Sequence, residues 1–161
     1  MEQKGTIMFT TKSLDKALNE VRGFHTTSIF SPKKSLVAYR LSKMSRNYRG
    51  GVVERMIRDY YKSQGKKVVY FGGSVSFDMM VDGKKIEVKS ALARPSKDGY
   101  AYRFQHICPA HFHKLVLVFI SPEGITSRVM DSRTAAKYTG SKYSHKGLYV
   151  GKKIFGRVLA A

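Results

Sequence analysis

Two carboxylates near the middle of the chain could together hold a divalent metal ion. Asp78 lies in Ser74–Val81, which alternates polar and apolar residues, and Glu87 lies in the following segment, Lys84–Ser90. The dipeptide Asp82-Gly83 between them is typical of a two-residue hairpin turn. With that turn, Asp78 lies directly opposite Glu87, with β-carbons about 4.5–5.5 Å apart. Opposed like charges destabilise a hairpin, and Mg²⁺, or Mn²⁺ in its place, would remove the conflict.

A lysine accompanies this pair. Lys89 follows Glu87 by two residues and therefore points to the same face of the strand. An ammonium group there can orient a water molecule or stabilise charge on a phosphate beside the metal. The same pattern also fits an ordinary solvent-facing strand on which Lys85 and Lys89 neutralise the two carboxylates. The hairpin alone therefore leaves both a catalytic and a structural interpretation open.

The charge of the chain indicates a polyanionic partner. Its 161 residues include 30 Lys and Arg against 11 Asp and Glu, a net charge of +19. Self-repulsion on this scale destabilises a compact state, so it usually serves binding to a polyanion. No acidic residue occurs between Glu20 and Glu54 or after Asp131, so two basic flanks bracket the carboxylates. Tyrosines and phenylalanines among the basic residues suit phosphate contacts and base stacking, and we expect nucleic-acid binding.

Several classes of protein are excluded by composition. No apolar run approaches the roughly 20 residues that cross a bilayer, so no membrane partner is expected. The first residues lack the apolar core of a signal peptide, and Cys108 is the single cysteine, which excludes an internal disulfide framework. We expect a cytoplasmic protein of one domain, within a prokaryote or a phage-infected host.

Periodicity predicts an α/β layer. The expected elements are helices at 14–21, 51–64 and 132–138, a short buried strand at 68–71, the hairpin, a central strand at 115–120 and a further strand at 125–130. Residues 24–47 show no clean period and predict an extended arm or short strand pieces. A loop is expected around Pro95 and Gly99.

The order of these motifs resembles a known family. The residues that carry the resemblance are Arg49-Gly50-Gly51-Val52-Val53-Glu54-Arg55, Gln64-Gly65, Val68-Val69, Gly72-Gly73-Ser74, Asp78 and Ile86-Glu87-Val88-Lys89. Over about residues 46–120 they resemble the PD-(D/E)xK nuclease core, and are most similar to archaeal-type Holliday junction resolvases. The resemblance implies a restriction endonuclease-like mixed β-sheet flanked by α-helices, and Mg²⁺-dependent hydrolysis of DNA phosphodiester bonds in recombination.

The resemblance also implies roles for particular residues. Asp78, Glu87 and the backbone carbonyl of Val88 would be metal ligands, and Lys89 would serve the attacking water. Glu54 would be an outer acidic residue that orients water or a second metal.

Further residues would contact DNA. Arg55 and Ser74 would touch the scissile phosphate or the DNA backbone, and Gln105 could be an accessory site residue. The basic N-terminal flank would hold the backbone through Lys33, Lys34, Arg40, Lys43, Arg46 and Arg49.

The substrate and even the class of function have alternatives. The stretch Tyr102-Arg103-Phe104-Gln105 looks more like restriction-type or phage nucleases, so a restriction-type, homing or phage sequence-specific endonuclease is the second interpretation. A non-catalytic basic nucleic-acid-binding protein is the third. That protein would gain nothing from opposed carboxylates, which repel phosphate. A duplex-cutting enzyme of this size is expected to be a homodimer, because one small active site cuts one strand.

The single nuclease domain is expected to span 1–161, with a basic N-terminal extension at 1–45, a core at 46–138 and a basic C-terminal segment at 139–161. Between core strands, His106, Cys108, His111 and His113 crowd into eight residues. Imidazole and thiolate at such spacing can bind Zn²⁺. The alternative is a surface loop whose histidines add positive charge near DNA.

Overall fold

The computed structural model describes residues 29–160 of the chain. The elements are α2 (Leu36–Ser42), α3 (Arg46–Ser63), β1 (Val68–Tyr70), β2 (Met79–Val81), β3 (Lys84–Leu92), β4 (Arg94–Ser96), β5 (Gly99–Ile107), the 3₁₀ helix η1 (Pro109–His111), β6 (Lys114–Ser121), β7 (Gly124–Asp131), α4 (Ser132–Thr139), β8 (Lys146–Val150) and α5 (Lys152–Ala160). The helix expected at 14–21 lies outside the described residues. Within them, no helix combines the length and apolar composition that a membrane crossing requires.

The main sheet has five strands in the order β1-β2-β3-β6-β7. Only β3 and β6 pair in parallel within it, and the other neighbours are antiparallel, so the sheet is mixed as expected. β6 is the apolar run predicted as a central strand, and its residues Leu115–Ile120 are buried on both faces. The α/β class and the strands at 115–120 and 125–130 are confirmed.

An unusual crossover joins the two parallel strands. Parallel neighbours require a connection of a dozen or more residues, most often a helix. Here the connection consists of the β4–β5 hairpin followed by η1. β5 then pairs with β8 from the end of the chain, which gives a second sheet of order β4-β5-β8. The loop expected around Pro95 and Gly99 is therefore wrong, because both residues belong to this hairpin.

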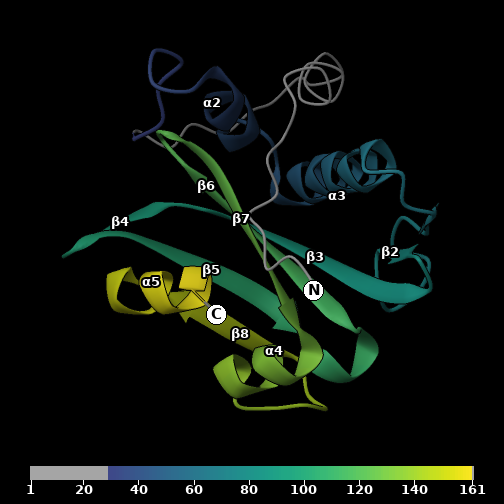
Figure 1. The fold of residues 1–161 in the computed structure, drawn as a ribbon. Coiled ribbons are helices and arrows are strands. Elements are labelled where there is room, and N and C mark those ends of the chain that lie inside the picture. The colour runs from purple at the N-terminus through teal and green to yellow at the C-terminus, as the bar shows by residue number, and fades with distance from the viewer. Residues whose placement is uncertain (1–28, 161) are drawn as a thin grey trace.

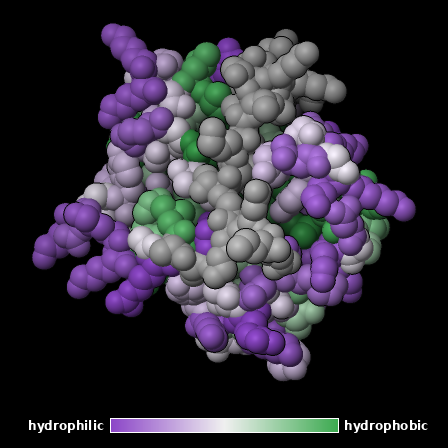
Figure 2. All heavy atoms as spheres, viewed as in Figure 1, coloured by the Kyte–Doolittle hydropathy of each residue, from purple (hydrophilic) through white to green (hydrophobic). Residues whose placement is uncertain are grey.

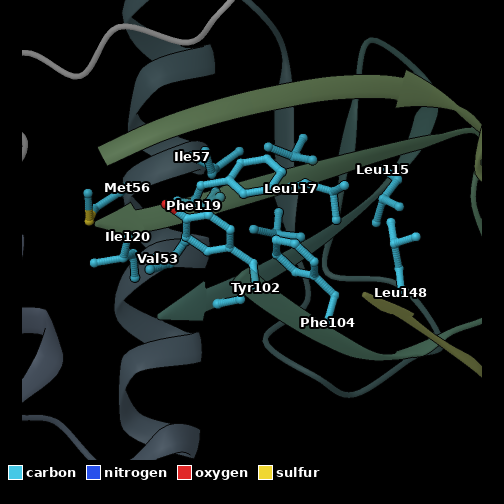
Figure 3. Close-up of a cluster of buried hydrophobic side chains, with 14 of the residues drawn as sticks. Val53, Met56, Ile57, Tyr102, Phe104, Leu115, Leu117, Phe119, Ile120 and Leu148 are labelled. Carbon is cyan, nitrogen blue, oxygen red and sulfur yellow. The ribbon is translucent and has the colours of Figure 1, made fainter. Parts of the chain in front are cut away.

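The elements form layers around the main sheet. Figure 1 shows α2 and α3 on one side of it and the second sheet with α4 and α5 on the other. Figure 3 shows the side chains of β6 between those of α3 and those of β5. Phe119 of β6 has edge-on ring contacts with Tyr102, Phe104 and Phe155, with centroids 5.0–5.1 Å apart. These aromatic contacts fasten the second sheet and α5 to the first sheet.

The hydrophobic core extends beyond the expected range 46–138 at both ends. The N-terminal contribution comes from α2 and its surroundings, and the C-terminal one from β8 and α5: Phe30, Ala38, Leu41, Met44, Leu148, Val150 and Val158. The expected arm or strand pieces at 24–47 are wrong where α2 forms. Its signal was Ser35, whose hydroxyl accepts a hydrogen bond from the amide of Ala38 as an N-cap.

Helix α3 begins five residues before the predicted start at 51. Ser45 caps it by accepting a hydrogen bond from the amide of Tyr48, so the helix includes the basic turn before the apolar stripe. Val53, Met56 and Ile57 of the predicted stripe are fully buried. This burial fixes the rotation of the helix and turns Glu54 to its edge, where the side chain is half-buried.

Two strand predictions need correction. The strand expected at 74–81 is regular only at β2, because Gly72 and Gly73 have φ of 60° and 86° and begin an irregular segment that continues to Asp78. β1 was expected to be buried, but Val69 is exposed, because among residues 29–160 β1 is an edge strand that pairs with β2 alone.

Replacing Leu117 by alanine should lower the free energy of unfolding by about 2–5 kcal/mol, because the side chain is 0% exposed and the close-packed layers leave a cavity. Leu36→Ala is the matched control. Leu36 is 49% exposed, and its loss should cost less than about 1 kcal/mol. Urea denaturation followed by circular dichroism measures both. Equal costs would contradict the placement of β6 inside the core.

Candidate active site

The β2–β3 hairpin has the predicted register, but only up to the carboxylates. Val81 pairs with Lys84 and Met79 with Ile86, as the Asp82-Gly83 turn requires. Beyond Met79 the ladder ends. The amide of Asp78 still donates to the carbonyl of Ile86, at 3.0 Å. Asp78 therefore does not continue as a strand residue opposite Glu87, and this part of the prediction is wrong.

The side chain of Asp78 supplies the hydrogen-bond acceptor that a continued ladder would supply from its backbone. Its Oδ2 accepts a hydrogen bond of 2.7 Å from the backbone amide of Val88. The N–H and C=O of one strand residue point to the same side, so the carbonyl of Val88 also faces the side on which Asp78 lies. The carboxylate and carbonyl that were predicted as metal ligands are thus brought together. Burial raises the pKa of Asp78, and the Val88 hydrogen bond opposes that rise.

Glu87 is nearly buried and pairs with the predicted lysine. Its side chain is on β3, only 8% of the residue is exposed, and its Oε1 lies 2.5 Å from Nζ of Lys89. Burial, and after it the negative charge of Asp78, raise the pKa of Glu87 to about 7 against the opposing effect of Lys89. Glu87 therefore binds its proton more tightly than an exposed glutamate does.

Glu54 reaches the same region from α3. Its Oε2 accepts a hydrogen bond of 2.9 Å from the hydroxyl of Tyr70 on β1. Burial and the charge of Asp78 raise the pKa of Glu54, while Tyr70, Lys89 and Arg55 oppose the rise. The Tyr70 bond was not foreseen, although a tyrosine at the end of a strand beside the helix was visible in the sequence.

The donor set fits a divalent cation with oxygen ligands. Three carboxyl groups whose pKa values are all raised share one region, and a cation there would relieve both their burial and their mutual repulsion. Among the described residues, the three-membered group of His, Cys, Asp or Glu whose ligand atoms all lie within 4.8 Å is elsewhere, at Cys108. The ligand atoms of Glu54, Asp78 and Glu87 are therefore not all within 4.8 Å of one another.

A basic cleft of about 620 Å³ opens at one side of this region. Glu54, Val88 and Lys89 line it, whereas Asp78 and Glu87 are not part of its lining. The remaining charged residues in its lining are all arginines: Arg46, Arg49, Arg94 and Arg103. A polyanion that enters would therefore meet arginine on its way to the carboxylates.

Gln105 also lines the cleft, as an accessory residue would. Its Oε1 accepts a hydrogen bond from the guanidinium of Arg46. The register of β5 against β8 shifts between Phe104 and Ile107, and His106 has a φ of 56°. Such a bulge changes the direction of side chains, and here both Gln105 and His106 are part of the cleft lining.

The residues predicted to bind DNA are not all brought together. Arg46 and Arg49 line the cleft, whereas Lys33, Lys34, Arg40 and Lys43 are not part of its lining. Arg49 also has a structural position: its Nη1 donates to the carbonyl of Met44, and burial lowers its pKa. Lys34 lies 3.6 Å from Glu123 in an exposed ion pair, and Lys43 lies over the ring of Tyr39.

The other two predicted DNA contacts have different surroundings. Arg55 follows Glu54 on α3, and its positive charge opposes the rise in the pKa of Glu54. Ser74 is exposed, and its hydroxyl donates to the carbonyl of Phe71 at 2.9 Å, which closes the glycine turn. This bond gives Ser74 a structural role whether or not it also touches a phosphate.

Sequence reasoning missed Arg94 and Arg103. Both are exposed on the β4–β5 hairpin, which had been predicted as a loop. They also line a second groove of about 480 Å³, together with Tyr102 and Tyr149. The aromatic residues Tyr100, Tyr102 and Phe104 at every second position were the available signal for this strand.

In comparisons with protein-family models, with curated proteins and with solved structures, the chain has no significant match.

Without metal, the free energy of unfolding should fall as the pH rises from about 4.3, the pKa of an unfolded glutamate, to about 7, the folded pKa of Glu87. A raised folded pKa means that the native state binds more protons, so stability is lost with rising pH. The loss should be on the order of 2–3 kcal/mol. Glu87→Gln should remove most of this dependence and stabilise the protein at pH 8.

The measurement is urea denaturation in EDTA across this pH range. Glu123→Gln is the control, because Glu123 is exposed and its pKa is lowered. A wild-type stability that rises between pH 5 and 7, or an equal effect of both variants, would contradict the assignment.

Proposed function

We propose that this protein is a metal-dependent DNA endonuclease that hydrolyses phosphodiester bonds. The observation that supports it best is the hydrogen bond from the Val88 amide to Asp78, which holds this carboxylate against β3, the strand that carries Glu87 and Lys89, and Lys89 lines an arginine-rich cleft. This arrangement also accords with the resemblance of residues 46–120 to the PD-(D/E)xK core. A protein that only binds nucleic acid has no use for three carboxyl groups that repel one another there.

Each residue has a role in this proposal. Asp78, Glu87 and the Val88 carbonyl would hold Mg²⁺, or Mn²⁺ in its place, which would activate a water and stabilise charge on the phosphate. Lys89 is paired with Glu87 when no metal is bound. When Glu87 also binds the metal, Lys89 would orient the attacking water beside the scissile phosphate. Glu54, held by its hydrogen bond from Tyr70, accepts a hydrogen bond from a water molecule.

The cleft favours a nucleic-acid substrate. On the face seen in Figure 2, hydrophilic side chains project from the outline of the molecule on several sides, in keeping with the net charge of +19. The arginines of the cleft belong to helix α3 and to both strands of the β4–β5 hairpin, which suits contacts along a phosphate backbone better than a single bound mononucleotide. We propose branched DNA, as in a Holliday junction, as the substrate, with a specific duplex sequence as the alternative. Either reaction would use a homodimer, since each site cuts one strand.

The test is cleavage of a four-way junction, a linear duplex and a single strand in Mg²⁺ by the full chain. Asp78→Asn and Glu87→Gln should each lower the rate by more than about 100-fold, since removing one key electrostatic group from an active site costs about 10²–10³. DNA binding should be unchanged or tighter, because a negative charge near the phosphate is removed. Retained cleavage in either variant would refute the metal site.

Lys89→Ala separates the roles in the same assay. It should also lose most activity, yet retain metal affinity because lysine is not a ligand. Asp59→Asn is the control: Asp59 is on α3 like Glu54, but it pairs with Arg58 at 2.8 Å and does not line the cleft. Loss of metal binding in Lys89→Ala to the degree seen in Asp78→Asn would contradict these roles.

Replacing both Arg94 and Arg103 by alanine should weaken DNA binding and flatten its salt dependence. Each phosphate contact on duplex DNA contributes about 0.9 to the slope of log K against log salt, so the slope should fall by about two. All sequences should be affected alike, since phosphate contacts carry no base information. Fluorescence anisotropy on two unrelated duplexes and one junction, from low to moderate salt, measures the effect.

Arg133→Ala with Lys137→Ala is the charge-matched control on α4, outside the lining of both grooves. An unchanged slope in the Arg94 and Arg103 variant would exclude the cleft as the binding surface. A loss confined to the junction would favour the resolvase over the sequence-specific enzyme.

A further inference from the structure

The structure separates the four histidine and cysteine residues that crowd around η1. His106 lines the basic cleft, and Nδ1 of His113 accepts a hydrogen bond of 2.9 Å from the amide of Lys85. Cys108 and His111 instead lie together with His145, which comes from the loop between α4 and β8. The zinc set considered from the sequence is thus replaced by one whose members come from two distant segments.

These three side chains converge for identifiable reasons. Cys108 precedes η1 and His111 ends it, so one 3₁₀ turn brings both to the same side. The amide of Ala110 donates to the carbonyl of Lys142 at 2.8 Å, which fixes the α4–β8 loop against η1. Within that loop, the amide of Ser144 donates to the hydroxyl of Ser141. His145 follows directly and reaches His111, with ring centroids 5.4 Å apart.

We propose that Cys108, His111 and His145 bind a Zn²⁺ ion. Their ligand atoms, one sulfur and two imidazole nitrogens, all lie within 4.8 Å of one another. Zinc bond lengths of about 2.3 Å to sulfur and 2.0–2.1 Å to nitrogen imply ligand separations of about 3.3–3.6 Å in a tetrahedral site. Small side-chain rotations close that difference. Thiolate and imidazole select zinc over Mg²⁺, so this site is chemically distinct from the carboxylates of the cleft and does not depend on the proposed nuclease activity.

The surroundings suit a site with three protein ligands and a water. Cys108 is 3% exposed, His111 is half-buried and His145 is exposed, so the site has a closed and an open side. The nearby cation of Lys142 lies over the ring of Tyr143, at 5.2 Å from its centroid. Binding releases the thiol proton of Cys108 to solvent and leaves both imidazoles neutral. The ion would link η1, which leads into β6, to the loop that leads into β8, and so join the two sheets at this end.

The test uses the full chain without a histidine tag, in excess Mg²⁺ that saturates the carboxylate site. Competition with a chromophoric chelator should show one tightly bound Zn²⁺ per chain. Substitution by Co²⁺ should give the thiolate charge-transfer band and the visible bands of a tetrahedral site. Cys108→Ser should abolish the charge-transfer band and weaken zinc binding by more than about 100-fold, since even an outer-shell partner contributes 10–100-fold.

His145→Gln should weaken zinc binding to a similar degree, and this exposed position leaves the fold intact. His106→Gln is the matched control from the same stretch of chain and should bind zinc like the wild type. Added zinc should raise the melting temperature of the wild type and of His106→Gln but not of His145→Gln. An absence of tight zinc binding in the wild type, or unchanged affinity in Cys108→Ser or His145→Gln, would overturn the proposal.

Discussion

The candidate site depends on one hydrogen bond, from the amide of Val88 to the carboxylate of Asp78. The β2–β3 ladder ends just before it, because the glycine turn at Gly72 and Gly73 makes the preceding segment irregular. A regular strand there would supply a backbone carbonyl to Val88. With the side chain of Asp78 in that position, a carboxylate is held against the middle of β3, and its charge adds to burial in raising the pKa of Glu87.

The site is an acidic island within a strongly basic protein. Burial raises the pKa of its three carboxyl groups, while Lys89 opposes the rise at all three and Arg55 opposes it at Glu54. Nearby positive charge therefore offsets part of the cost of burying these carboxyl groups. The sulfur and nitrogen donors of Cys108, His111 and His145 lie together elsewhere, at η1.

Short sequence signals, such as a turn dipeptide or an apolar run, predicted the elements that depend on neighbouring residues. The Asp82-Gly83 turn gave the pairing of Met79 with Ile86, and continuous apolarity gave the buried strand β6. The position of Asp78 was not predictable from alternation, because its partner is a backbone amide and the deciding glycines lie outside the alternating segment. Likewise Arg103 and His145 reach their sites through the β5–β8 pairing and the α4–β8 loop, which join segments far apart in the chain and leave no periodic signal.

The crossover built from the β4–β5 hairpin separates two tasks that a helix would combine. Its base is fixed by the aromatic contacts of Tyr102 and Phe104 with Phe119. Its tip near Gly99 is exposed, and there the strands β4 and β5 pair with each other. Exposed hairpin tips accept insertions and deletions with little loss of stability. The hairpin can therefore lengthen or shorten during evolution by changes at this tip, while β3, the strand that carries Glu87, stays constant.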